Sequence, residues 1–232
     1  METPLLVFTT DFGLADSYVG VMKGVASGIN PQARFIDLTH GIGPQDVAQG
    51  AFVLGVNYQH FPTYSIHVVV VDPDVGTNRW PVLVSTPHGR FIGPDNGVLS
   101  GVLADYLDDP SDTPMSIALP PGISAVRLTN ETYWNHPVSD TFHGRDVFAP
   151  VAAQLSLGVP PTELGVPIER LVWLPMLKPM ANSKGVRGQV IYRDGFGNLV
   201  SNIPADLLSG HTVLFEIKGR TIERLSRTFA DC

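Results

Sequence analysis

The most continuous β-branched run of the chain, from Ser65 to Val71 (SIHVVVV), constrains its fold more than any other segment. β-Branched side chains favour extended backbone, and a strand that is apolar on both faces suits the middle of a parallel sheet covered by helices on both sides. The run stops at Asp72, which a turn-rich segment follows. The pattern therefore predicts a buried strand that delivers a carboxylate at its carboxyl end.

The segments around this run alternate between strand and helix patterns, which indicates an α/β fold. A short apolar run at residues 5–10 precedes a helical pattern that ends near Ile29. The remaining elements are expected as a strand near 35–38, a helix at 46–58, a hairpin of 82–86 with 90–93, and helices at 97–106 and 144–157. We therefore expect an α/β domain with a mainly parallel central sheet.

Proline divides the chain into two parts. Five prolines between residues 158 and 184 exclude long helices and predict a connection between two packed units. Short β-type runs follow at 185–193, 199–203, 212–217 and 221–226. We predict an N-terminal α/β domain at 1–158, a proline-rich linker at 159–184 and a small antiparallel β-barrel domain at 185–232.

Composition excludes several classes of function. The 232 residues are 44% hydrophobic, enough for a large core, and the 15 basic and 22 acidic residues give a formal charge of −7, which argues against nucleic acid as a partner. No apolar run is long enough to cross a bilayer, and the N-terminus lacks the basic start of a signal peptide, so we expect a cytoplasmic protein without membrane contact. The one cysteine, Cys232, excludes an intrachain disulfide or a cysteine-based metal site.

Polar residues gather where two predicted strands end, which is where open α/β sheets bind ligands. Asp11 follows the first strand and could bind a sugar diol or cap the next helix. Asp72 and Arg79 lie seven residues apart and could form a structural clamp or polarise a bound water. From the pattern alone, the clamp is favoured for this pair, and both readings of Asp11 stay open.

Two further clusters are ambiguous. His143 precedes a predicted helix among charged residues, whereas the other six histidines have no metal-binding spacing and are expected at the surface or in packing: His40, His60, His67, His88, His136 and His211. Asp194 and Asn198 enclose a Gly-Phe-Gly turn and could also bind the ammonium and carboxylate of an amino acid. The glycines favour the turn, and nothing local decides the second role.

The sequence lacks the motifs that commonly bind cofactors or carry a catalytic nucleophile. It has no Gly-x-Gly-x-x-Gly after the first strand, no Gly-Lys-Ser/Thr phosphate loop and no Gly-x-Ser-x-Gly elbow, and its acids do not group as a metal cage. We therefore expect neither a metal nor an organic cofactor, and a glycine-loop methyltransferase is disfavoured.

Six motifs in order resemble one family. They are TTDFG at 9–13, DLTHGIGPQDV at 37–47, VDPDVGTNR at 71–79, GPDNG at 93–97, TFHGRD at 141–146 and DGFGNLVSNI at 194–203. Together they are similar to the S-adenosylmethionine (SAM) hydroxide adenosyltransferases, relatives of the fluorinase and chlorinase enzymes. The resemblance runs from about Leu5 to Ile203.

The resemblance implies hydrolysis of SAM to adenosine and methionine by attack at the ribose C5′, with SAM as substrate and no cofactor. It also implies a homotrimer with active sites between subunits, and a barrel continuing beyond Cys232, so that this C-terminal domain is expected to be incomplete relative to the family. The catalytic residues implied are Asp72, Arg79 and His143. The substrate-binding residues implied are Asp11 for the ribose, Asp194 and Asn198 for methionine, and Phe142, Phe196 and Asn96.

The triad favours a hydrolase over a halogenase. Asp72 stands where the fluorinase pattern has a tyrosine, and a carboxylate there would repel a halide. The sulfonium leaving group needs no acid to expel it, so the task of the enzyme is to position a water-derived nucleophile. Two alternatives stay open: a halide-dependent SAM halogenase, and a non-catalytic protein that binds SAM or adenosine.

Overall fold

The computed structural model of this chain describes residues 4–183, 185–208 and 213–222. It separates into two compact units, Met1–Met176 and Leu177–Cys232, which are described one at a time.

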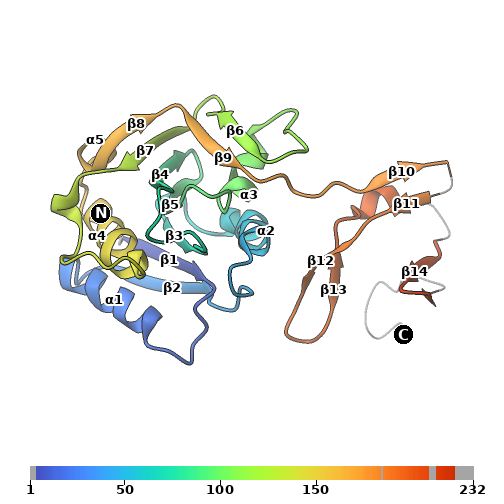
Figure 1. Cartoon of the computed structure of the whole chain (residues 1–232), viewed down its shortest axis with the longest axis horizontal. Helices are drawn as coiled ribbons and strands as arrows, with labels where there is room; N and C mark the ends of the chain where they lie inside the picture. The colour runs from blue at the N-terminus through green and yellow to red at the C-terminus, as the bar shows by residue number, and fades with distance from the viewer. Residues whose placement is uncertain (1–3, 184, 209–212, 223–232) are drawn as a thin grey trace. The chain divides into compact units, whose positions relative to one another are not determined.

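The first unit is built on a seven-stranded sheet (Figure 1). Its parallel half consists, in spatial order, of β2 (Arg34–Thr39), β1 (Leu5–Thr10), β3 (Ile66–Val70) and β5 (Gly89–Pro94). The sheet continues with antiparallel pairings through β4 (Pro81–Thr86), β7 (Ser124–Leu128) and β8 (Gly165–Ile168). The predicted α/β class with a buried valine-rich strand is confirmed, because every residue of β3 is buried and β3 lies between two parallel neighbours.

Helices cover both faces of this sheet. α1 (Tyr18–Ile29) and α4 (Ala149–Ser156) pack together on one face, where Leu6 and Phe8 belong to the same buried cluster as the α4 side chains. α2 (Val47–Asn57) and the one-turn α3 (Ser100–Leu103) pair on the other face (Figure 1). Successive strand side chains point to opposite faces, so covering both faces buries every position of β1 and β3.

Glycine permits the close approach of α2 and α3. A Cβ at Gly55 would lie 2.8 Å from the carbonyl oxygen of Gly101, closer than two such atoms can pack. The helix expected at 97–106 is present only as α3 followed by a 3₁₀ turn at Ala104–Tyr106.

The structure adds strands that the sequence pattern did not predict. β6 (Met115–Ala118) pairs with β9 (Arg170–Trp173), and β7 and β8 extend the main sheet. β8, β9 and the short helix α5 (Pro161–Leu164) lie inside the range predicted as a linker, yet belong to the first unit. These strands are only four or five residues long, and their pairings form between segments far apart in the chain, which local periodicity does not report.

The remaining short helices of the first unit lie in its loops. They are 3₁₀ turns at Tyr58–His60 and Glu131–Tyr133, and a π-helix at Gly144–Phe148 that runs directly into α4. The helix predicted at 144–157 is thus present as a π-helical turn followed by α4.

The second unit consists of antiparallel hairpins, which confirms the strand type predicted for it. β10 (Met180–Asn182) pairs with β11 (Gly185–Arg187), β12 (Val190–Arg193) with β13 (Leu199–Ser201), and β14 (Phe215–Ile217) with β15 (Arg220–Ile222). A 3₁₀ turn at Ala205–Leu208 precedes β14. The prediction of one continuous strand at 185–193 was wrong, because this segment forms two strands with different partners. Positions 212 and 223–226 of the later predicted runs lie outside the described residues.

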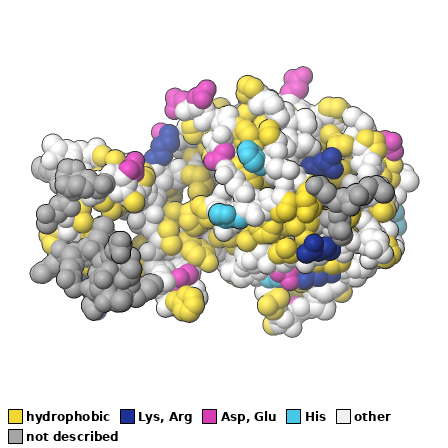
Figure 2. Space-filling model, turned by 180° about the vertical axis from the view of Figure 1, so that it is seen from behind, with side chains coloured by type: hydrophobic (Ala, Val, Ile, Leu, Met, Phe, Trp, Pro, Cys, Tyr) yellow, Lys and Arg dark blue, Asp and Glu magenta, His cyan; other side chains and the backbone are white. Residues whose placement is uncertain are grey.

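Large apolar side chains reach the surface. Leu14 is 78% and Phe196 95% exposed, and Figure 2 shows hydrophobic side chains gathered in patches among polar ones on one face. Among the described residues, no helix is both long and apolar enough to span a bilayer.

Candidate active site

Two acidic residues lie at the carboxyl ends of neighbouring strands of the central sheet. Asp11 follows β1 and Asp72 lies just beyond β3, and the two strands are parallel neighbours with Thr10 opposite Val70. Side chains at this edge are displayed beyond the strand ends, where α/β sheets bind ligands.

Arg79 joins Asp72 to His143. Its Nε donates to Asp72 Oδ1 at 2.9 Å, and its Nη2 donates to Asp72 Oδ2. The same Nη2 lies 2.7 Å from His143 Nδ1. The side chains of Asp72 and Arg79 are only 4% and 6% exposed, so this pairing is shielded from water.

A tight turn and an aromatic ring hold Arg79 in place. The Thr77 amide and hydroxyl both donate to the Asp74 carbonyl, at 3.1 and 2.7 Å. Gly76 has φ +79°, and a Cβ there would overlap the Asp140 carbonyl, so the turn requires glycine. The Arg79 guanidinium lies 5.3 Å from the centre of the Phe148 ring, a cation–π contact.

The contact with Arg79 defines the state of His143. A guanidinium has only donors, so His143 Nδ1 accepts, and the neutral ring carries its proton on Nε2. Burial and the positive charge of Arg79 lower the pKa of His143, while the carboxylates of Asp72, Asp146 and Asp140 partly oppose that shift. A neutral imidazole at pH 7 follows from this environment.

A buried carboxylate supports the segment that carries His143. Asp146 is fully buried and accepts hydrogen bonds from Arg145 Nε at 2.6 Å, the Ser139 amide at 2.9 Å and Asn135 Nδ2 at 3.1 Å. Burial raises the pKa of Asp146, but these donors outweigh it and hold the pKa below its usual range. The charged Asp146 therefore fixes the loop before His143 to the π-helix after it.

The structure argues against one of the two readings of Asp11. The residue at the N-terminus of α1 is Ser17, and Asp11 Oδ2 instead accepts from the Gln45 amide at 2.8 Å. Asp11 therefore does not cap the helix, and its role toward a ligand stays a prediction.

An aromatic group lies beside the Asp11 loop. The ring centre of Phe142 is 6.0 Å from that of Phe12 and 5.1 Å from that of Tyr18. Tyr18 is 46% exposed, so this group offers an apolar surface next to His143.

The amide of Asn96 is occupied by backbone contacts. Its Nδ2 donates to the Val71 carbonyl at 2.9 Å, and its Oδ1 accepts from the Val98 amide at 3.1 Å. Asn96 thus ties the residue before Asp72 to the following loop, and its substrate-binding role stays a prediction.

The other predicted substrate residues lie in the second unit. Asp194 accepts from the amides of Phe196 and Asn198 at 2.9 and 2.8 Å and from Asn198 Nδ2 at 2.6 Å. Burial raises the pKa of Asp194, but hydrogen bonds from Asn198, Phe196 and Gly197 lower it overall. The turn between β12 and β13 is confirmed, and the amino-acid-binding role of these residues stays a prediction.

Sequence reasoning missed the residues that support Asp11. His40, which the sequence left among surface or packing histidines, is 5% exposed and lies 2.8 Å from the Thr10 hydroxyl. Gln45 supplies the amide that binds Asp11. The signal that could have found both residues is the DLTHGIGPQDV motif at 37–47, which contains His40 and Gln45.

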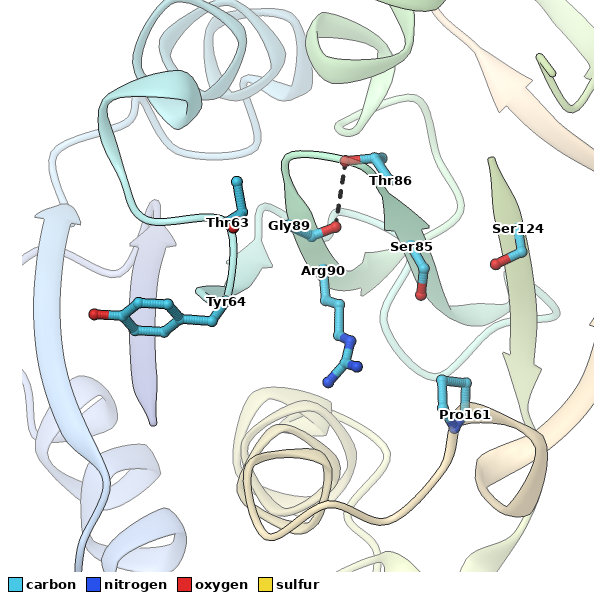
Figure 3. Close-up of a pocket in the computed structure, with 8 residues that line it drawn as sticks. All are labelled: Thr63, Tyr64, Ser85, Thr86, Gly89, Arg90, Ser124 and Pro161. Carbon is cyan, nitrogen blue, oxygen red and sulfur yellow. Dashed lines mark hydrogen bonds between the residues drawn. The ribbon is translucent and has the colours of Figure 1, made fainter. Parts of the chain in front are cut away.

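Two cavities are open on the first unit. One, of about 450 Å³, adjoins the triad and is lined by Arg79, Trp80, Arg127 and Trp134 among others. The other, of about 460 Å³, surrounds Arg90 at the opposite edge of the sheet (Figure 3) and contains no predicted site residue. Within the described part of the chain, no three His, Cys, Asp or Glu side chains are grouped to hold a metal ion.

Comparison with known proteins places this geometry in a family. Residues 6–165 match the SAM hydroxide adenosyltransferase N-terminal domain, and residues 188–232 match the C-terminal domain of the same family. The (R)-S-adenosyl-L-methionine hydrolase of Salinispora arenicola is 40% identical over 90% of this chain and 79% of that protein. A fluorinase of an Actinoplanes species is 25% identical over 86% of this chain and 72% of its own length.

A solved structure gives the same result. The crystal structure of an uncharacterized conserved protein from Thermotoga maritima has a TM-score of 0.84 and 34% identity, covering 98% of this chain and 85% of that one. Both domain matches lie in the expected order along the chain, as the six sequence motifs do. The chain belongs to the SAM hydroxide adenosyltransferase family.

Proposed function

We propose that this protein hydrolyses SAM to adenosine and L-methionine by attack of a water-derived nucleophile on the ribose C5′. The observation that carries the proposal is the shielded array in which Arg79 contacts both Asp72 and His143 at the sheet edge that also presents Asp11. The hydrolases among the curated relatives support this chemistry.

The reaction needs positioning more than activation of the leaving group. A bond forms between the water oxygen and C5′ while the C5′–S bond breaks, and its electron pair neutralises the sulfonium to give the thioether of methionine. A proton must leave the attacking water. Holding that water in line with the C5′–S bond, away from bulk solvent, is the main contribution expected of the protein.

Asp72 is the better proton acceptor of the two candidates. His143 Nδ1 faces the Arg79 guanidinium, and Nε2 carries the ring proton, so the neutral imidazole has no free lone pair for water. Asp72 retains lone pairs beyond those that Arg79 occupies. We assign Asp72 as the group that accepts the proton, Arg79 as the group that orients it, and His143 as a donor that orients the water.

The substrate-binding roles are those that the family resemblance implies, and the chemistry of the side chains agrees with them. Asp11 would accept hydrogen bonds from the ribose hydroxyls, and Phe142 would pack against the nucleoside. Asp194 and Asn198 would bind the ammonium and carboxylate of methionine, with Phe196 and Asn96 as further contacts.

The proposal also covers how the chain assembles. We propose a homotrimer with each active site between subunits, and exposed apolar side chains such as Leu14 and Tyr18 beside the Asp11 loop support an interface there. Catalysis without a metal or organic cofactor and a cytoplasmic location remain part of the same proposal.

The test is product analysis in isotopically labelled water. The purified protein is incubated with SAM in ¹⁸O-water, with separate reactions for the (R) and (S) sulfonium epimers because the relative is named for the (R) form. Adenosine with one ¹⁸O at the 5′-oxygen, together with unlabelled methionine, is expected without any halide.

Two results would replace the proposal. A 5′-halogenated nucleoside that forms only with chloride or fluoride would assign a halogenase. Binding of SAM without any product would assign a binding protein.

A further inference from the structure

We propose that His40 is a positioning residue that holds the ribose-binding carboxylate of Asp11 in place, an inference that rests on the ribose role proposed for Asp11. His40 directly follows β2, contacts the strand that precedes Asp11, and is buried although its ring is polar.

The first link runs from the His40 ring to both neighbours of Asp11. The Thr10 hydroxyl lies 2.8 Å from His40 Nδ1 and accepts from the Phe12 amide at 3.2 Å. With the amide proton directed at its oxygen, the hydroxyl can donate its own proton to Nδ1. One histidine nitrogen thereby fixes the residues on either side of Asp11.

The backbone of the His40 loop makes the second link. The Gly13 amide donates to the His40 carbonyl at 2.8 Å, and the Gln45 amide donates to Asp11 Oδ2 at 2.8 Å. Gln45 adopts φ +64°, a left-handed conformation that is uncommon outside glycine. The loop thus holds the Asp11 turn at its backbone and at its carboxylate, and accepts an unfavourable dihedral to do so.

The far side of the ring faces a carboxylate. His40 Nε2 lies 2.9 Å from Asp37 Oδ1, close in distance but without good hydrogen-bond geometry. Asp37 Oδ2 accepts from Lys23 Nζ at 2.6 Å. Burial raises the pKa of Asp37, but its contacts with Lys23 and His40 lower it overall, so the carboxylate beside the ring is charged.

The simpler reading is that His40 only fills space under the loop. The two readings differ in what they predict for ligands. A positioning role affects ligands that contact the Asp11 carboxylate, because the strength of a charge-assisted hydrogen bond depends on geometry. A packing role lowers stability and affects all nucleosides equally.

The experiment compares adenosine with 2′,3′-dideoxyadenosine, which lacks both ribose hydroxyls. Dissociation constants are measured by calorimetry for the full chain and its variants, and each variant is checked for folding by circular dichroism. The wild type is expected to bind adenosine more tightly, and Asp11→Asn is expected to lose that preference.

Three variants of His40 separate its contacts. His40→Phe removes both ring nitrogens and is expected to reduce the preference for adenosine by about tenfold, typical of losing one hydrogen bond to a charged group. His40→Asn places an amide oxygen near the position of Nδ1 and should restore most of it, whereas His40→Gln should not. His60→Asn, at an exposed histidine outside the site, is the matched control.

The outcomes distinguish the inference from its premise. A wild type that binds both nucleosides equally would remove the ribose role of Asp11. If Asp11→Asn loses the preference while folded His40→Phe keeps it, the positioning role is overturned. Should His40→Phe not fold, Thr10→Val removes the linking hydroxyl at nearly constant volume, and an unchanged preference there overturns the inference equally.

Discussion

Arg79 Nη2 lies 2.7 Å from His143 Nδ1, although the two residues are 64 positions apart in the chain. The guanidinium also binds Asp72 through two nitrogens, so one planar cation sets the orientation of a carboxylate and an imidazole together. The sequence pattern favoured a structural clamp for Asp72 and Arg79. The added contact with His143 shows that the pair also serves a third polar group at the ligand edge of the sheet.

Replacing Asp72 by asparagine should abolish most activity. The change keeps the size of the side chain but removes the proposed proton acceptor and the charge that Arg79 binds, so kcat should fall by about 10²- to 10⁴-fold. The rate of adenosine formation measures this. Asp74→Asn is the control, since Asp74 is exposed and its hydrogen bonds use the backbone carbonyl, and it should change the rate by less than about twofold. Equal rates in folded Asp72→Asn and wild type would rule out the triad.

Replacing Arg79 by lysine should also be costly, although the charge is kept. A lysine is a point charge without the planar fork, so it cannot hold Asp72 and His143 in their present orientations. We expect kcat/KM to drop by about 100-fold, as expected for a misplaced catalytic group. Arg90→Lys, at the opposite edge of the sheet, is the matched control and should retain activity (Figure 3). A fully active Arg79→Lys would show that positive charge alone suffices.

Activity should persist into mildly acid conditions. The orienting role requires neutral His143, whose pKa is lowered by burial and by Arg79 from its ordinary value near 6.5. Protonation would place a second positive charge against the guanidinium. A plot of log(kcat/KM) against pH should therefore show an acid limb whose midpoint lies below 6.5. An acid limb with its midpoint above 6.5 would contradict this environment.

His67 should make stability depend on pH without affecting catalysis. It is fully buried on β3, stacks on Phe91 at 4.8 Å between ring centres, and neither ring nitrogen has a hydrogen-bond partner in the described structure. Burial lowers its pKa to about 4. The unfolded chain therefore binds the extra proton first on acidification, and stability is full above pH 6.5 and lost as the pH falls toward 4, by at most about 3 kcal/mol.

Urea unfolding of His67→Phe at pH 7 and pH 4.5 tests this assignment. The variant should lose less stability than the wild type between the two pH values, because its core no longer contains a group that gains a proton on unfolding. The same pH dependence in both proteins would assign the acid sensitivity to other groups.

Local sequence patterns determined the parallel strands at the core of the fold and the positions where polar residues follow the strand ends. The valine run at 65–71 predicted β3, and the polar residue that ended it was Asp72, because strand propensity and apolar character are properties of the segment itself. The six motifs identified the family, which the domain matches confirm. The roles assigned to the individual site residues remain predictions.

Only the tertiary structure decided which of these groups meet. The contact of Arg79 with His143, the burial that lowers the pKa of His143 and the link from His40 to Thr10 all join segments that are distant in sequence. β7 and β8 likewise joined the sheet through pairings that no local pattern announced. The physical reason is that periodicity reports the environment of one segment, whereas a contact between two segments depends on loop closure and on how the whole core packs.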